Sequence, residues 1–285
     1  MGIQLARNIN KRPQLDLGEP MGNNELGLAR EFNAGFSLEK YLRASGATRP
    51  EAFDWSDGSS RLDDEALFCL GYMMDVEAHT IVYLREFLST SVIEDPAITA
   101  FLTCWNYEEF FHSQVLKQFL TSQGLRIEDQ RFTNLRRRKP ADRFAQIGAR
   151  LLSRMTRHLS AVQMTWGAIN EMIGIESYRA LAERTQHPLL GKILNQIIKD
   201  ERRHFAFYFN QAKARLRPRT AQALTTVLIK YLWTPVGSPL RGEAATRRLQ
   251  NYLYPNESAR RRLFELDSTI ARLPGLGWFN LATRY

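Results

Sequence analysis

The chain has 285 residues, 44% of them hydrophobic, and its 39 basic and 30 acidic side chains give a formal net charge of +9. This composition suits one large hydrophobic core, and no apolar run approaches the roughly eighteen residues needed to cross a bilayer. Cys69 and Cys104 lack metal-binding spacing, which argues against a disulfide framework or a zinc site, and without an apolar secretory signal a soluble cytoplasmic protein is expected.

The sequence pattern divides the chain into three segments. Residues 1–60 are mostly polar and predict an arm with one short helix over Leu26–Leu42, followed by a loop rich in Gly, Ser and Asp. Residues 61–216 have the apolar periodicity of a helical bundle, and residues 217–285 predict a helical extension that packs on it. Strand-like alternation is scarce, so the predicted fold is all-α.

Aspartate and proline mark the first hairpin of the bundle. Asp63 or Asp64 can cap a helix that runs to about Leu88. Asp95 followed by proline indicates the start of a second helix, Pro96–Gln123, which a glycine ends. The two helices are therefore expected to be antiparallel neighbours.

A long connection leads to the second hairpin. It contains the basic run Arg136–Lys139, which lies either in a loop or at a helix end, and a helical pattern follows over Ala141–Arg184. The later part of that pattern is the third bundle helix, and a turn at a proline begins the fourth, Pro188–Leu216. Further helices are predicted over Pro218–Trp233 and Glu257–Leu273. The architecture expected is two hairpins joined by a long crossover, with additional N- and C-terminal helices.

Two of the bundle helices carry the motif Glu-x-x-His, and each of the other two supplies a glutamate about thirty residues upstream. The six candidate ligands are Glu77, Glu109, His112, Glu171, Glu201 and His204. Residues i and i+3 share a helix face, so each motif can chelate. Each glutamate lies about 13 to 15 residues, or roughly 20 Å of helix, from its turn, so all four ligand groups reach one height. Carboxylate and imidazole ligands in a four-helix bundle suit two iron ions, with manganese as the alternative.

An alternative interpretation makes both motifs ordinary solvated helix pairs. It is disfavoured because apolar side chains surround the charges, and buried charges must be paired or bound to metal. The apolar neighbours are Trp105, Phe111, Leu116, Ile197 and Phe205. Asp75 and Glu108 compete as carboxylate ligands but rank second, since each disturbs either the pairing with histidine or the match in height.

Two segments carry a family resemblance: WNYEEFFHSQVLKQFL, and the stretch from Glu171 through KDERRH. They resemble the motifs of the soluble acyl-carrier-protein desaturases, a ferritin-like di-iron family. The resemblance covers roughly Leu70–Leu216. The resemblance implies a di-iron centre that uses O2 and two electrons to remove hydrogen from an unactivated carbon of an acyl chain. It implies the same six ligands, a homodimer, an acyl-carrier-protein or coenzyme A substrate, and an external donor such as a ferredoxin. Asp200 matches a carboxylate that orients a ligand histidine, and Trp105 is expected beside the ligands.

One departure from that family is a glycine, Gly174, where a threonine is expected next to the oxygen-binding face. It favours an oxygenation over simple desaturation, and the predicted O2 and substrate pocket consists of Met73, Ala168, Gly174 and Ile175. N-oxygenases resemble families with an extra histidine at the place of Ile197, which counts against them. The ligand pattern would also suit a ferritin-type ferroxidase or a protein whose metals are purely structural.

The positive charge predicts an acidic partner. Candidate residues for a basic face are Arg136–Lys139, Arg215, Arg217, Arg219 and Arg260–Arg262. Such a face would attract an acidic carrier protein, with a strong dependence on salt. No nucleic-acid recognition motif accompanies the charge, so nucleic-acid binding is not expected.

Overall fold

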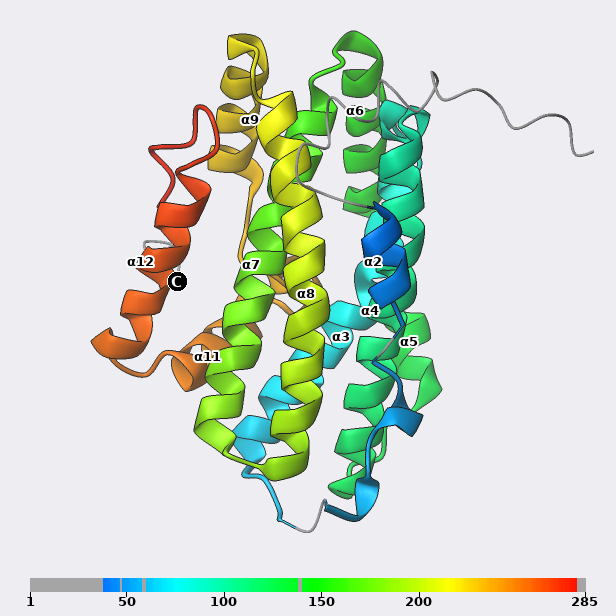
Figure 1. Ribbon diagram of the computed structural model, residues 1–285, viewed down its shortest axis with the longest axis vertical. Coiled ribbons are helices and arrows are strands. Elements are labelled where there is room, and N and C mark those ends of the chain that lie inside the picture. Colours follow the sequence, from blue (N-terminus) through cyan, green and yellow to red (C-terminus); the bar gives the residue numbers. More distant parts are fainter. Residues whose placement is uncertain (1–37, 47, 58–59, 138–139, 281–285) are drawn as a thin grey trace, which may run out of the picture.

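The structure is a computed structural model that describes residues 38–46, 48–57, 60–137 and 140–280. Its elements are helical, with no strand in the described ranges, so the all-α prediction is confirmed (Figure 1). The N-terminal helix α2 covers Leu38–Ala44, and the rest of the helix predicted over Leu26–Leu42 lies outside the described residues. Within these ranges no helix is long and apolar enough to span a bilayer; the cytoplasmic location stays a prediction.

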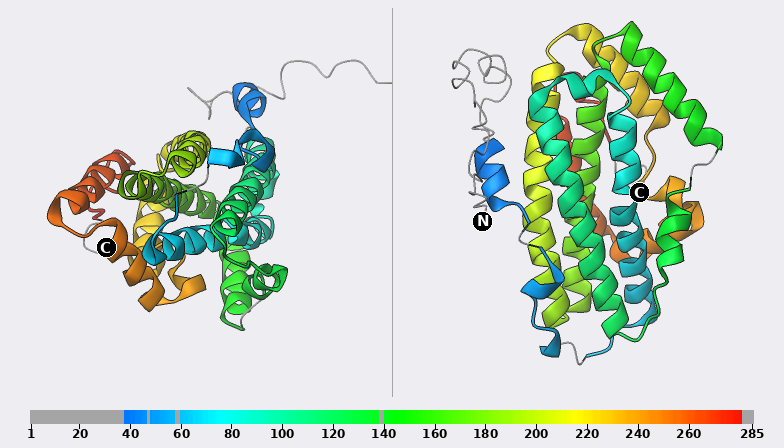
Figure 2. Two further views of the ribbon diagram at one scale, coloured as in Figure 1. Left: turned by 90° about the horizontal axis from the view of Figure 1, so that it is seen from below. Right: turned by 90° about the vertical axis from the view of Figure 1, so that its right-hand side faces the viewer.

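Four long helices form the bundle: α3 (Asp64–Phe87), α4 (Pro96–Ser122), α7 (Leu159–Thr185) and α8 (Pro188–Arg215). The helices α3 and α4 make one hairpin and α7 and α8 the other, and Figures 1 and 2 show the two hairpins side by side along one axis. The predicted pair of hairpins joined by a crossover is confirmed.

Local capping explains where these helices begin. The Asp63 carboxylate accepts a hydrogen bond from the Ala66 amide, and the Asp95 carboxylate accepts from the amides of Ala97 and Ile98. Each bond satisfies an amide that the first helical turn leaves without a partner. The short 3₁₀ helix η3 (Ser91–Glu94) makes the turn before Asp95.

The crossover contains α5 (Asp129–Leu135) and α6 (Pro140–Met155). The continuous helical pattern predicted over Ala141–Arg184 is therefore divided, with a break between α6 and α7. At the break the Thr156 hydroxyl accepts from the His158 amide at 3.1 Å, a local bond that competes with helical pairing. Figure 2 shows α6 to one side of the bundle, so the crossover adds a helix outside the core.

The C-terminal helices lie against the bundle, and the main contacts are made with α3 and α7. They are α9 (Arg219–Leu232), α10 (Ser238–Arg241), α11 (Glu243–Leu253) and α12 (Glu257–Ile270). The helices predicted over Pro218–Trp233 and Glu257–Leu273 are confirmed with slightly shorter ends, while α5, α10 and α11 were not predicted. Short 3₁₀ helices, η1 (Pro50–Ala52) and η2 (Trp55–Asp57), precede the bundle. The division of the chain at residues 60 and 216 stays a prediction.

The hydrophobic core consists of two clusters, and the bundle helices α4, α7 and α8 pass from one to the other. One cluster contains Phe101 of α4 and Phe207 of α8, whose rings stack with centroids 3.8 Å apart. The other contains Phe119 of α4 and Ile193 of α8. On α4 and α8 the Glu-x-x-His motifs lie between the residues that enter the two clusters. The candidate ligands of α4 and α8 therefore lie in a polar layer between two apolar ones.

A close approach of α7 to α8 requires glycine at Gly167. A Cβ added there would lie 2.4 Å from Cδ1 of Tyr208, whose ring is buried. We expect Gly167→Ala to lower the free energy of unfolding by about 1–3 kcal/mol, because the ring must shift within a packed core. Denaturant titration measures the loss. The matched control is Gly191→Ala on α8, where an added Cβ meets no atom within 4 Å and alanine should stabilise the helix; equal effects at both positions would contradict the steric explanation.

Candidate metal centre

The six predicted ligand residues come together in the interior of the bundle. The helices α3 and α7 supply one glutamate each, and α4 and α8 supply a Glu-x-x-His each. Their exposed fractions run from 0% for the two histidines to 8% for Glu171. The solvated alternative is therefore wrong, because none of these charged side chains faces water.

The side chains form two groups that share two glutamates. One group is Glu77, Glu109, His112 and Glu201, and the other is Glu109, Glu171, Glu201 and His204. In each group one ligand atom per residue lies within 4.8 Å of all the others. The shared glutamates give the cluster two adjacent centres, which is the arrangement expected for a pair of metal ions.

The first centre is built around Nδ1 of His112. This atom lies 3.1 Å from Oε1 of Glu201, 3.6 Å from Oε2 of Glu109 and 3.8 Å from Oε2 of Glu77. It is buried and makes no hydrogen bond to the described residues. A buried imidazole nitrogen without a hydrogen bond, directed at three carboxylates, fits a metal ligand.

The second centre repeats this geometry around Nδ1 of His204. The nitrogen lies 3.1 Å from Oε1 of Glu109, 3.3 Å from Oε2 of Glu201 and 3.7 Å from Oε2 of Glu171. Glu109 and Glu201 thus direct one oxygen to each histidine, whereas Glu77 and Glu171 serve one histidine each. The shared pair would supply ligands to both centres, and a donor set of carboxylates and imidazoles can hold metal ions.

Two carboxylates, called the rear carboxylates, lie at the Nε2 atoms of the histidine rings, away from the ligand glutamates. Nε2 of His112 lies 3.2 Å from Oδ2 of Asp200, and Nε2 of His204 lies 2.8 Å from Oε2 of Glu108. The guanidinium of Arg203 joins them, with Nη2 at 2.7 Å from Oε1 of Glu108 and from Oδ1 of Asp200. The role predicted for Asp200 therefore fits the geometry, since such partners fix the ring orientation of ligand histidines.

Two competing ligand candidates have other roles. Glu108 is outside both ligand groups, and its carboxylate contacts Nε2 of His204. The sequence carries a signal for this role, because an acid precedes the glutamate of both motifs and each acid serves the histidine of the other motif. Asp75 is fully buried and forms ion pairs with Arg131, at 2.6 Å, and with Arg241. It therefore ties α3 to the crossover and to α10.

Helix α2 and the segment that follows it cover the carboxylates of Glu108 and Asp200. The Tyr41 hydroxyl donates to Oε2 of Glu108 at 2.7 Å, and the Gly46 amide donates to Oε1 of Glu108 at 3.2 Å. The Thr48 hydroxyl donates to Oδ2 of Asp200. These contacts were not predicted, because they join residues that are 62 to 152 positions apart.

Each unshared glutamate accepts one hydrogen bond from the polar group of an aromatic side chain. Trp105 Nε1 donates to Oε1 of Glu171 at 2.9 Å, so Trp105 lies beside the ligands as expected. The Tyr178 hydroxyl donates to Oε1 of Glu77, a contact that was not predicted. Both donors leave the second oxygen of their glutamate directed toward a histidine.

The pKa values of the four carboxyl groups shift in two directions. Burial, together with nearby carboxylates, raises the pKa of Glu77 and of Glu171 well above the ordinary value. Burial acts in the same direction on the shared pair, but contact with Glu171 and the histidines holds the pKa of Glu201 well below its usual range. Contacts with Glu77 and the histidines likewise lower the pKa of Glu109. The shared and unshared glutamates therefore differ in the direction of their pKa shifts.

The pKa values of both histidines are raised. Burial acts to lower the pKa of His112, but contacts with carboxylates, Asp200 foremost, raise it well above the usual value. The pKa of His204 is raised against burial by Tyr41 and Glu108. Because ligand residues must be deprotonated to bind a cation, a metal ion would compete with protons at this cluster.

The residues of the predicted O2 and substrate pocket belong to both core clusters. Met73 and Ile175 pack in one core cluster, and Ala168 lies in the other. At Gly174 an added Cβ would meet no atom within 4 Å, so there is open space beside this residue. The pocket stays a prediction.

The rear carboxylates give the first test of the metal centre. We expect Glu108→Gln and Asp200→Asn each to weaken metal affinity about 10- to 100-fold, because each removes the charge that holds a histidine ring in place. Competition with a coloured chelator measures the affinity. Asp129→Asn, at an exposed ion pair with Lys117, is the control. Unchanged affinity in both rear variants would contradict the positioning role.

The fold and the site define a helical bundle with a buried carboxylate and imidazole cluster that can hold metal ions. No protein-family model matches the chain, and no curated protein matches it.

Proposed function

We propose that the protein is an O2-activating di-iron oxidoreductase that oxidises an acyl chain attached to a carrier protein or to coenzyme A. The observation that carries this proposal is the sharing of Glu109 and Glu201 between two adjacent centres. A bound pair of iron ions supplies the two-electron redox chemistry that O2 reduction requires. The resemblance of the two motifs to the acyl-carrier-protein desaturases supports the acyl substrate.

The chain's own residues hold the centre and keep water away from it. Asp200 and Glu108 fix the rings of the two histidines, while Trp105 and Tyr178 orient the unshared glutamates. The apolar clusters on both sides of the ligand layer exclude water, which protects a reactive oxidant from side reactions.

The electrons come from outside the chain in this proposal. The sequence has no nucleotide-binding glycine fingerprint, and its two cysteines are too few for an iron–sulfur cluster. A ferredoxin-like donor and a homodimeric assembly belong to the same proposal. Manganese is the alternative metal, because the same ligands accept it.

An acidic carrier protein is the partner that the net charge favours. The predicted basic residues do not all remain available, since Arg215 is paired with Asp95 and Arg262 with Glu176. Arg217, Arg219 and Arg260 are exposed. We expect turnover of a carrier-bound substrate to slow as salt is raised, while turnover of a coenzyme A thioester changes less; equal salt dependence would contradict carrier docking.

Single-turnover O2 consumption tests the activity. The iron-loaded protein is chemically reduced without O2 and then mixed with oxygenated buffer, with or without palmitoyl carrier protein. We expect the acyl substrate to accelerate O2 consumption and to be recovered as an alkene or an alcohol. Substrate-independent oxidation of many ferrous ions per chain would indicate a ferroxidase instead, and no O2 consumption would indicate a structural metal site.

A further inference from the structure

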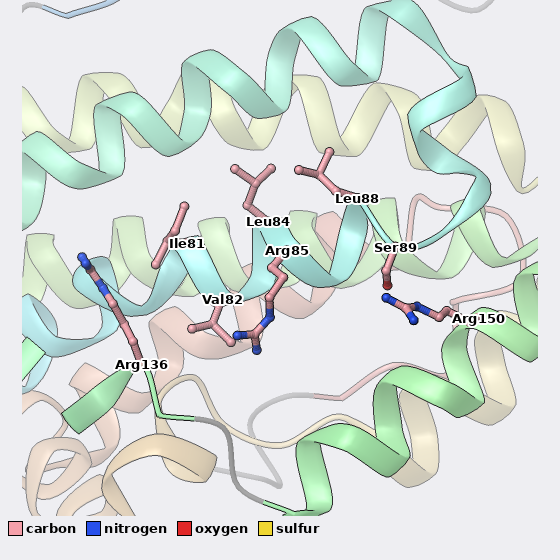
Figure 3. A pocket seen from close by; sticks show the side chains of 8 residues that line it. All are labelled: Ile81, Val82, Leu84, Arg85, Leu88, Ser89, Arg136 and Arg150. Carbon is pink, nitrogen blue, oxygen red and sulfur yellow. The ribbon is translucent and has the colours of Figure 1, made fainter. Parts of the chain in front are cut away.

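A groove of about 470 Å³ runs along the second half of α3, outside the ligand cluster (Figure 3). Ile81, Val82, Leu84 and Leu88 provide its apolar surface. Arg85, Ser89, Arg136 and Arg150 complete the lining, the last of these from α6. The volume falls within the range of roughly 300–1,000 Å³ that small-molecule sites have.

The apolar surface is an elongated stripe. Ile81, Leu84 and Leu88 follow Glu77 at i+4, i+7 and i+11, so they share one face of the helix. The stripe from Ile81 to Leu88 is about 10 Å long at 1.5 Å per residue. Ile81 and Leu88 remain 38% and 44% exposed, while Leu84 between them packs partly against the core, so the two ends of the stripe are open. The shape fits a single aliphatic chain.

The charge of the groove is entirely positive. Three of its eight lining residues are arginines and none is acidic. In Figure 3, Arg136 stands at one end of the stripe and Arg150 lies beside Ser89 at the other. Arg85 Nε is buried and has no hydrogen-bond partner in the described ranges, and the ion pair of this guanidinium with Glu86 is long, at 3.9 Å from Nη2. An oxyanion in the groove would satisfy this donor.

We propose that this groove binds a monomeric amphiphile with one aliphatic chain and an oxyanionic head such as a carboxylate. The chain lies on Ile81, Leu84 and Leu88, and the head is held by Arg85 and Arg150. A hollow of this size favours one bound molecule over a flat lipid surface. The site is separate from the metal ligands, so binding does not depend on the proposed redox activity.

Calorimetric titration of the full chain with decanoate tests the proposal. Decanoate should bind, whereas decan-1-ol, which lacks the charge, and butyrate, which lacks the long chain, should bind at least about tenfold more weakly. Arg85→Gln and Arg150→Gln should each weaken decanoate binding about tenfold, because each removes a charge-assisted hydrogen bond. The matched control is Arg137→Gln, at an exposed arginine next to Arg136 but outside the groove, and it should leave the affinity unchanged.

A further variant examines the apolar stripe. Leu88→Glu changes a half-exposed position, so the fold should persist, and it should weaken decanoate binding through repulsion and lost apolar contact. The proposal is overturned if decanoate does not bind, if decan-1-ol binds equally well, or if the two groove arginines can be removed without effect. Binding to phosphatidylglycerol vesicles without binding of monomeric decanoate would also overturn it. Exposed Ile147, Leu151 and Met155 of α6 would then be the contact with the lipid surface.

Discussion

Glu109→Ala and Glu201→Ala should each abolish binding of both metal ions, whereas Glu77→Ala and Glu171→Ala should each remove one ion. The reason is geometric, because Glu109 and Glu201 belong to both ligand groups and the other two glutamates belong to one. Loss of a shared carboxylate leaves each centre with three residues and removes the oxygens that join the two sites. Loss of an unshared one leaves the opposite centre with all four of its residues.

Elemental analysis of folded, gel-filtered protein measures this difference. We expect two ions per chain in the wild type, near zero in the shared-ligand variants and about one in the unshared-ligand variants, as the ligand count of each centre requires. Glu94→Gln, at an exposed glutamate of η3, is the control. Circular dichroism confirms that each variant is helical before analysis. Two ions per chain in Glu109→Ala would show that the ligand assignment is wrong.

The bundle was predictable because its signals are local. Asp63 and Asp95 cap helices at the positions that their sequence context indicates, and the proline at Pro188 begins α8. With the helix ends known, the rise per residue places the ligand groups at one height. The polar layer between the two core clusters is the structural counterpart of that calculation.

The crossover and the extension were less predictable because the extension depends on tertiary contacts and the crossover is interrupted by a local side-chain bond. The helix α11 lies against α3 and α7, and its Thr246 hydroxyl bonds to the Tyr72 hydroxyl 174 residues away. The break before α7 depends on a local bond of Thr156 that competes with an otherwise helical pattern. Apolar periodicity alone does not indicate either of these two bonds.

In the candidate site, too, residues with a local sequence signal were predictable and residues from distant segments were not. Spacing within a helix identified the two chelating pairs, and the turn arithmetic matched them with Glu77 and Glu171. The partners Tyr41, Thr48 and Tyr178 come from distant segments, so no spacing rule could assign them. Glu108 is intermediate, since its position before Glu109 marks it as important but equally suits a ligand or a rear support.

Removal of metal should destabilise the protein strongly. Metal binds the folded cluster and has no preformed site in the unfolded chain, so free metal at about 1,000 times its dissociation constant adds about 4 kcal/mol to the free energy of unfolding. For a chain of this size that corresponds to a change in Tm on the order of 10 °C. Thermal unfolding followed by circular dichroism, with ferrous iron under nitrogen and again after chelation, measures the shift.

The double variant Glu109→Ala, Glu201→Ala separates this effect from general ion binding. Because both centres lose their shared carboxylates, its Tm should not respond to ferrous iron or to the chelator. The variant also removes two buried carboxyl groups that contact both histidines in the metal-free cluster. The Tm of the metal-free variant therefore reports how much the metal-free cluster itself contributes to the stability of the fold. A metal-dependent rise in Tm equal to that of the wild type would place the bound metal elsewhere on the chain.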